Sequence, residues 1–141
     1  MSTNYFLLAG GLLSVGATVL HVYIIIKGGD MYRKFGAGEK LAAMDEAGSW
    51  YPAVLTSGIA LVLFVWGLYA FSGAGLIQIL PMLKPALMVI ATIYLLRGLV
   101  LIPLWIGWTE QVNGFVVWSS LVSLLFGLCY AIGTWQVWNR L

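Results

Sequence analysis

Four long apolar runs constrain this chain more than any other feature of its sequence. A helix needs about 20 apolar residues to cross the roughly 30 Å hydrocarbon core of a bilayer. Residues 5–26, 53–71, 85–106 and 115–137 meet that length. Backbone groups in lipid must be hydrogen-bonded within their own segment, and the runs lack the alternating pattern of barrel strands. The sequence therefore predicts an all-α membrane protein, a single domain over residues 1–141 that forms a four-transmembrane-helix bundle.

The composition also favours lipid as the solvent of this chain. Hydrophobic residues make up 62% of it and charged residues 9%, whereas a soluble domain has about half and about a quarter. The net charge is only +2, and no basic run is present that would neutralise a nucleic-acid backbone. We therefore expect membrane lipids, and no nucleic acid, among its partners.

Residues 27–52 form the one long polar loop of the sequence. Its eight charged side chains are Lys27, Arg33, Lys34, Lys40, Asp30, Glu39, Asp45 and Glu46. Residues 39–47 favour a short amphipathic helix with Leu41 and Met44 on one side, and we expect this helix to lie along the membrane surface. It is either a solvated connection or a functional lid, and the sequence leaves both interpretations open.

The distribution of lysine and arginine predicts an orientation in the membrane. The side that bears the long loop carries four basic residues, and the other side carries Lys84 and Arg140. Because basic loops stay in the cytoplasm, we expect the long loop to be cytoplasmic and both termini to lie outside.

Three stretches carry a resemblance to known proteins: Phe35-Gly36-Ala37-Gly38-Glu39, Tyr69-Ala70-Phe71-Ser72-Gly73-Ala74-Gly75 and Tyr94-Leu95-Leu96-Arg97-Gly98-Leu99. They look like segments of bacterial four-helix inner-membrane proteins of unknown function. The resemblance implies an integral protein of a bacterial inner membrane and no particular activity.

Arg97 is the one charged residue inside an apolar run. It lies about twelve residues into the third run, near mid-depth of a continuous helix at about 1.5 Å per residue, where an arginine costs about 2.5–3.5 kcal/mol to insert. It is either an anion, headgroup or proton-relay site or a structural pairing with a carboxylate or helix-end carbonyls. Because no run contains an acid, a carboxylate partner must come from a loop. The candidates are Glu39, Asp45, Glu46 and Glu110.

His21 is the only histidine of the chain. It ends a stripe of otherwise small residues at helical spacing: Gly10, Ser14, Ala17 and His21. Small residues permit close helix approach, so we expect His21 to lie beside another helix, near Arg97 or Tyr94. It is either a hydrogen-bonded interior histidine or a proton-responsive or ligand-binding group.

A second stripe of small residues recurs every four positions in the fourth run: Ser119, Ser123, Gly127 and Ala131. This spacing is typical of a tight helix–helix contact. The contact is either internal to the bundle or between copies of the chain, so a homo-oligomer or a partner membrane subunit is possible.

The remaining chemistry excludes several classes of site. One histidine and one cysteine in different helices supply neither a zinc site nor a pair of haem ligands. No phosphate-binding loop and no nucleophile motif is present, so we expect no metal, no cofactor and no catalytic residue. The sequence favours a non-enzymatic membrane protein that binds a lipid, small amphiphile or partner subunit around Arg97 and His21. The alternatives are a small oligomeric transporter or channel and, less favoured, an enzyme acting on a lipid-soluble substrate.

Overall fold

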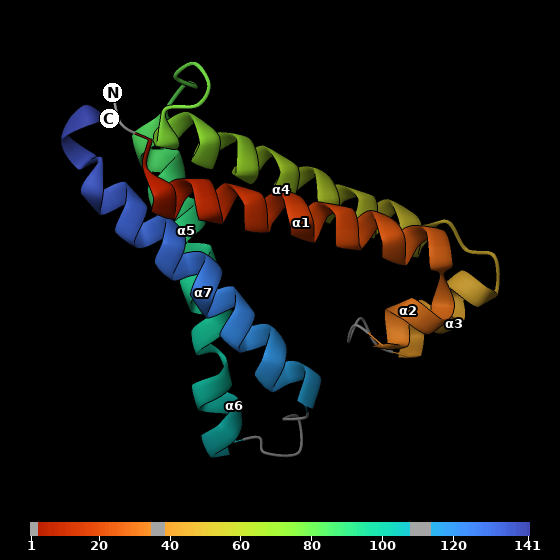
Figure 1. Cartoon of the computed structure of the whole chain (residues 1–141). Coiled ribbons are helices and arrows are strands. Elements are labelled where there is room, and N and C mark those ends of the chain that lie inside the picture. Colours follow the sequence, from red (N-terminus) through yellow and green to blue (C-terminus); the bar gives the residue numbers. More distant parts are fainter. Residues whose placement is uncertain (1–2, 35–38, 108–113) are drawn as a thin grey trace. The chain divides into compact units, whose positions relative to one another are not determined.

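The computed structural model describes residues 3–34, 39–107 and 114–141, and every regular element among them is a helix (Figure 1). The helices are α1 (Tyr5–Lys27), α2 (Gly29–Lys34), α3 (Glu39–Glu46), α4 (Tyr51–Ala74), α5 (Leu83–Leu99), α6 (Leu101–Gly107), α7 (Gly114–Gln136) and the 3₁₀ turn η2 (Trp138–Arg140). The predicted all-helical class is confirmed. Contacts divide the chain into two compact units: unit 1 is Met1–Ser14 with Trp66–Leu141, and unit 2 is Val15–Val65.

In the part of the chain that the structure describes, three helices are long and apolar enough to cross a membrane. They are Tyr5–Lys27, Tyr51–Ala74 and Val117–Gln136, and they correspond to the first, second and fourth predicted spans. Such a length and composition are compatible with a location in a membrane.

The third predicted span, residues 85–106, is covered by two helices rather than by one. Helix α5 ends at Leu99, and α6 begins at Leu101. Pro103 explains the break, because proline has no N–H to donate to the Leu99 carbonyl and its ring collides with that carbonyl. In the structure Pro103 lies in the first turn of α6, where a helix tolerates proline.

The ends of the long helices are set by local hydrogen bonds. The Asn4 side-chain oxygen accepts from the Leu7 N–H at 2.9 Å and so caps α1. Gly75 ends α4 with a φ of 89°, and the N–H groups of Gly75 and Leu76 donate to the carbonyls of Ser72 and Phe71. This is a Schellman ending, which requires the left-handed conformation that glycine adopts without strain.

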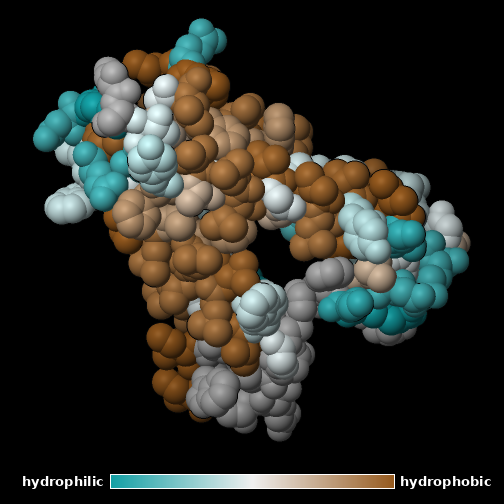
Figure 2. Space-filling view, in the orientation of Figure 1, coloured by the Kyte–Doolittle hydropathy of each residue, from teal (hydrophilic) through white to brown (hydrophobic). Residues whose placement is uncertain are grey.

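The polar loop folds into two short helices. Helix α3 occupies the residues predicted for a short helix, and α2 was not predicted. Leu41 and Met44 are half-buried, and Ala42 between them is fully buried in a cluster with Ile24 and Tyr32. Figure 2 shows that hydrophilic residues gather over α2 and α3, whereas the surface over α5 and α7 is mainly hydrophobic.

Candidate functional site

Helices α5 and α7 of unit 1 pack closely against each other, and glycine makes this approach possible. A Cβ on Gly98 would lie 2.8 Å from the backbone nitrogen of Leu124, and one on Gly127 would lie 2.8 Å from that of Leu95. Real Cβ atoms do not approach other atoms so closely. The pair therefore depends on a glycine from each helix, in the manner of small-residue contacts between membrane helices.

Arg97 lies on this helix pair and bonds to α7. Its two terminal nitrogens donate to the hydroxyls of Ser120 and Ser119, each at 3.1 Å. Ser120 is fully buried, whereas Arg97 is exposed. Hydroxyls are neutral acceptors, so these two bonds orient the guanidinium without cancelling its charge.

The break after Leu99 changes the position of Arg97 within its helix. Arg97 lies in the last turn of α5, about 21 Å along the axis from Leu83 at about 1.5 Å per residue. A cation in the last turn interacts favourably with the carbonyl end of the helix dipole. This placement is compatible with a structural pairing of Arg97 with helix-end carbonyls, which is one of the two roles that the sequence predicts.

A chain of buried hydroxyl groups joins the helices of unit 1. The Tyr130 hydroxyl donates to the Trp66 carbonyl at 2.9 Å. Because a phenol has one proton, the 2.8 Å contact between Tyr130 and Ser14 has Ser14 as its donor. The 2.9 Å contact between Ser14 and Tyr94 then has Tyr94 as its donor. The chain thus runs from Tyr94 through Ser14 and Tyr130 to Trp66, and links α5, α1, α7 and α4.

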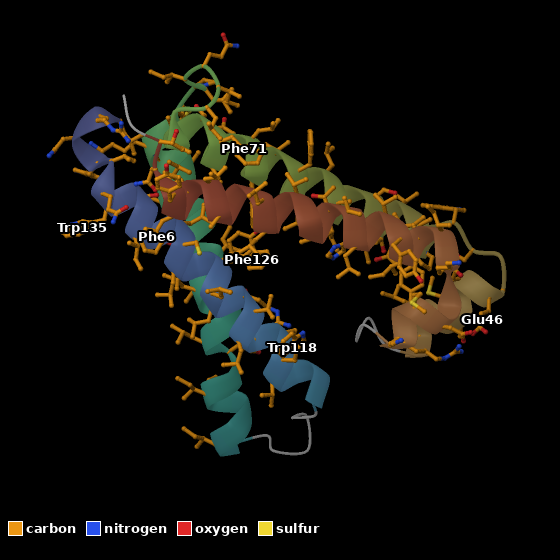
Figure 3. The ribbon with its side chains drawn as sticks, in the orientation of Figure 1. Phe6, Glu46, Phe71, Trp118, Phe126 and Trp135 are labelled. Carbon is orange, nitrogen blue, oxygen red and sulfur yellow. The ribbon has the colours of Figure 1, made fainter. Side chains whose placement is uncertain are left out.

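Aromatic rings surround this chain. The Tyr94 ring packs edge-on against Trp66 at 5.1 Å and against Phe126 at 5.2 Å, and it lies 5.4 Å from Tyr130. Figure 3 labels Phe126 on α7. Such ring pairs stabilise beyond their buried area. Tyr94 therefore takes part in both the chain of hydroxyls and the aromatic contacts of unit 1.

His21 belongs to unit 2 and bonds to its own helix. Its Nδ1 lies 2.6 Å from the Ala17 carbonyl, and because a carbonyl only accepts, Nδ1 carries the proton. In the neutral ring Nε2 is then the acceptor. The side chain is half-buried, and the hydrogen bond to Ala17 fixes the orientation of its ring.

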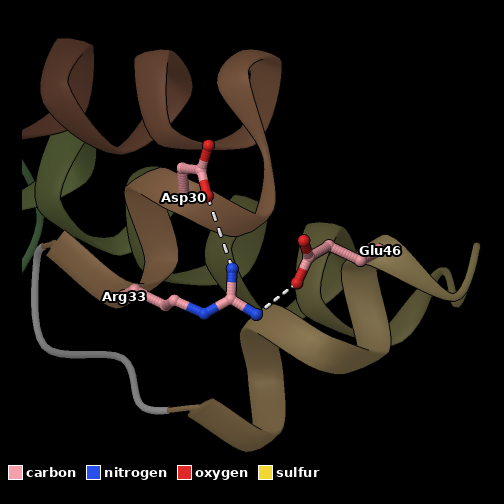
Figure 4. Close-up of polar contacts among 3 residues, drawn as sticks. All are labelled: Asp30, Arg33 and Glu46. Atoms are coloured by element: carbon pink, nitrogen blue, oxygen red, sulfur yellow. Dashed lines mark hydrogen bonds and ion pairs between the residues drawn. The ribbon is translucent and has the colours of Figure 1, made fainter.

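Two of the acidic candidates, Asp45 and Glu46, lie in α3. The Arg33 guanidinium forms ion pairs with Glu46 and, at 3.4 Å, with Asp30 (Figure 4). Asp45 lies beside Gly28, where a Cβ would meet its carboxylate oxygen at 2.6 Å. Glu46 is therefore bound to Arg33 within unit 2.

The structure brings together only part of the predicted site. Arg97, Tyr94, Ser119, Ser123 and Gly127 all lie at the α5–α7 contact, where the Ser123 hydroxyl also donates to the Tyr94 carbonyl at 2.9 Å. Three of the four residues in the stripe of small residues thus take part in a helix–helix contact within the chain.

The other candidates lie elsewhere in the chain. Ala131, the fourth member of the stripe, is half-buried, and His21, Asp45 and Glu46 belong to unit 2. Glu110 and the side chain of Glu39 lie outside the described residues.

Sequence reasoning missed two members of the contact network. They are Tyr130, which lies in the fourth apolar run, and Ser120, which is the neighbour of Ser119 in the stripe. Ser14 was noted only for its size. A polar side chain in an apolar run was the available signal, because hydroxyls buried in lipid need partners.

Among the described residues, no group of three or more His, Cys, Asp or Glu side chains forms a metal site. Searches of protein-family models, curated proteins and solved structures find no match to the chain. Its function therefore has to be inferred from its own residues.

Proposed function

We propose that this chain is an integral membrane protein with four membrane-crossing segments, which binds the phosphate of an anionic lipid headgroup at Arg97. The third crossing segment is α5 continued by α6. The proposed location is a bacterial inner membrane with residues 27–52 in the cytoplasm. One observation carries the lipid site: an exposed guanidinium on an apolar helix pair, held by two neutral hydroxyls.

The depth of Arg97 supports a headgroup ligand. Arg97 donates to Ser119 and Ser120, which directly follow Trp118 in α7, and tryptophan prefers the membrane–water interface. A long arginine side chain near that level reaches the headgroups by extending toward them. At that level the phosphate of a lipid is the most abundant anion.

The tryptophans of α7 support the same membrane boundaries. Trp118 and Trp135 lie toward opposite ends of α7 (Figure 3) and are 69% and 78% exposed. They are separated by about 26 Å along the axis. Tryptophan prefers the two membrane–water interfaces, so this spacing matches a helix that crosses the bilayer.

The chemistry of the guanidinium favours phosphate. Arginine binds a phosphate through two parallel hydrogen bonds, and Ser119 and Ser120 place hydroxyls beside it. The proposal is one of binding rather than catalysis, because these hydroxyls orient a ligand without supplying an acid or base. His21 has a local partner in Ala17 and is not part of the proposed site.

Native mass spectrometry with added phosphatidylglycerol or phosphatidylcholine tests this site. We expect Arg97→Gln to weaken phosphatidylglycerol binding about tenfold, the equivalent of one charge-assisted contact, and to weaken phosphatidylcholine binding less, because the choline cation offsets the charge of its phosphate. Arg97→Lys should bind with intermediate affinity, because the charge remains and the paired geometry is lost. Arg33→Gln removes the same charge from unit 2 and is the matched control.

Two results would contradict the proposal. The first is an equal loss of lipid in Arg33→Gln, which would indicate a nonspecific effect of net charge. The second is stronger lipid binding in Glu110→Gln, which would indicate that this carboxylate occupies the guanidinium in the native chain.

A further inference from the structure

The connection between α4 and α5 is both apolar and exposed (Figure 1). Residues 75–82 include no charged side chain, and their only polar one is Gln78. Four large apolar side chains in this connection are exposed: Leu76 by 50%, Ile77 by 41%, Ile79 by 78% and Met82 by 76%. Connections that face water are normally polar, and an exposed apolar patch marks a surface that meets a membrane or another protein.

The connection turns back along α4 instead of extending away from its end. The Ser72 hydroxyl, in the last turn of α4, donates to the Gln78 carbonyl at 2.9 Å and accepts from the Leu80 N–H at 3.0 Å. The Tyr69 hydroxyl, from nearly one turn earlier, donates to the Pro81 carbonyl at 3.1 Å. This part of the connection therefore lies beside the end of a helix that is long and apolar enough to cross a membrane.

The end of α7 marks the same boundary for the other end of the connection. Lys84 follows the connection in the first turn of α5, and its ammonium lies 3.9 Å from the centre of the Trp138 ring. Trp135, in the last turn of α7, is 78% exposed. Tryptophan prefers the membrane–water interface, and a lysine near a helix end extends toward it. Both ends of the connection are thus next to markers of the bilayer boundary.

The backbone of the connection suits a water-poor environment. Irregular backbone is costly in lipid where its N–H and C=O groups lack partners. Ser72 and Tyr69 bond to three of these groups, and Pro81 has no N–H. Met82 then adopts a left-handed conformation, with a φ of 55° and a ψ of 36°, which is uncommon for a residue with a side chain. The connection therefore has a defined path that leaves its apolar side chains exposed.

We infer that residues 76–82 form an interfacial anchor, which inserts Ile79 and Met82 among the acyl chains just below the lipid headgroups. Lipid is the expected occupant of this surface, rather than a second copy of the chain, because α4 and α7 place it at the bilayer boundary. Apolar side chains held there resist movement into water, so the anchor fixes the depth of the adjoining helix ends. The inference rests on the proposed membrane location and is independent of the lipid site at Arg97.

Spin labelling of the full chain in nanodiscs of phosphatidylglycerol and phosphatidylcholine tests the anchor. The native cysteine is removed as Cys129→Ala, and a single label is attached in the separate variants Ile79→Cys and Met82→Cys. Oxygen concentrates in lipid, whereas a nickel chelate stays in water, so the ratio of their effects on relaxation of the label reports its surroundings. We expect oxygen to dominate at both positions.

Two reference positions define the scale of this ratio. Leu61→Cys places the label in the interior of α4, at a side chain that is 63% exposed, and Asp30→Cys places it at a side chain of the polar loop that is 90% exposed. A ratio at Ile79 and Met82 that matches Asp30 would mean water, and exclusion of both reagents would mean a covering protein. Either result would overturn the inference.

The same measurement separates this inference from the proposed function. If the Leu61 label itself matches the Asp30 label, the proposed membrane location fails together with the anchor. If Leu61 reports lipid and Ile79 reports water, only the anchor fails, and the site at Arg97 is unaffected.

A further variant tests how the anchor is held. Ser72→Ala leaves the Gln78 carbonyl and the Leu80 N–H without their partner, and because free backbone groups favour water, the ratio at Ile79 should shift toward the chelate. Ser57→Ala removes an exposed hydroxyl of α4 and is the matched control, which should leave the ratio unchanged. Circular dichroism checks the fold of each variant. An unchanged ratio in Ser72→Ala would overturn the role assigned to Ser72.

Discussion

The two units of this molecule differ in the number and the balance of their charged groups. Unit 2 contains four basic and four acidic side chains and has no net charge, whereas unit 1 contains three basic and one acidic side chain. In unit 2 the ion pairs of Arg33 lie at the surface. In unit 1 the side chains of Ser14 and Tyr130 are fully buried, and their hydroxyls form a hydrogen bond with each other.

This difference shows which polar contacts are expected to stabilise the fold. Exposed ion pairs are worth about 0–1 kcal/mol and are screened by salt. A buried hydroxyl that loses its partner costs about 1–3 kcal/mol, although hydrogen bonds in membrane proteins average nearer 0.6 kcal/mol. Unit 1 should therefore be sensitive to packing and hydroxyl deletions, and unit 2 to ionic strength.

The largest expected effect is that of a single methyl group at Gly98. Gly98→Ala places a Cβ 2.8 Å from the Leu124 backbone, and because backbone cannot easily move aside, we expect a loss of about 1–3 kcal/mol. The measurement is the free energy of unfolding in mixed micelles titrated with sodium dodecyl sulfate.

Gly58→Ala in unit 2 is the matched control. Nothing lies within 4 Å of a Cβ at Gly58, so alanine there should stabilise the helix by about 0.5–1 kcal/mol through its lower backbone entropy. Equal effects of the two substitutions would show that the α5–α7 contact is no tighter than the open face of α4.

The sequence predicts where the helices of this molecule lie along the chain better than it predicts which face of each helix meets its neighbours. Long apolar runs locate three of the long helices, because the length of such a run is a local property of the sequence. Pro103 is a local signal for the break at Leu99, which the length of the apolar run alone does not reveal. Helix boundaries are thus predictable wherever the local breakers are given their full weight.

The candidate site was less predictable for a physical reason. The long helices are apolar on nearly all faces, so no hydrophobic stripe indicates which side of each helix meets its neighbours. Arg97 and Tyr94 were noticed as exceptions to the apolar pattern. Their partners Ser120 and Ser14 depend on the rotation of α7 and α1, which only tertiary packing determines.

An intermediate effect is expected from removing one hydroxyl in each unit. Tyr130→Phe deletes the donor to Trp66 and the acceptor for Ser14, and should lower the free energy of unfolding by about 1 kcal/mol. Tyr32→Phe in unit 2 deletes one longer bond, from Thr56 at 3.3 Å, and should cost less.

A double-mutant cycle separates the hydrogen bond from other effects of the tyrosine change. Combining Ser14→Ala with Tyr130→Phe should give a coupling of at least about 0.5 kcal/mol, typical of residues in one network. Additive effects of the two substitutions would mean that the buried chain of hydroxyls is not a cooperative unit, and the contrast between the units would weaken.

The smallest expected effect is that of the ion pair in unit 2. Glu46→Gln removes one partner of Arg33 and should cost about 0.2–1 kcal/mol at low salt. Asp30→Asn should cost less, because the Asp30 side chain is 90% exposed and its bond is 3.4 Å long. Both effects should vanish in 1 M NaCl, where the screening length is about 3 Å, whereas the cost of Ser14→Ala should not change. A salt-independent cost for Glu46→Gln would instead place this pair in a buried, unscreened setting and remove the distinction between the two units.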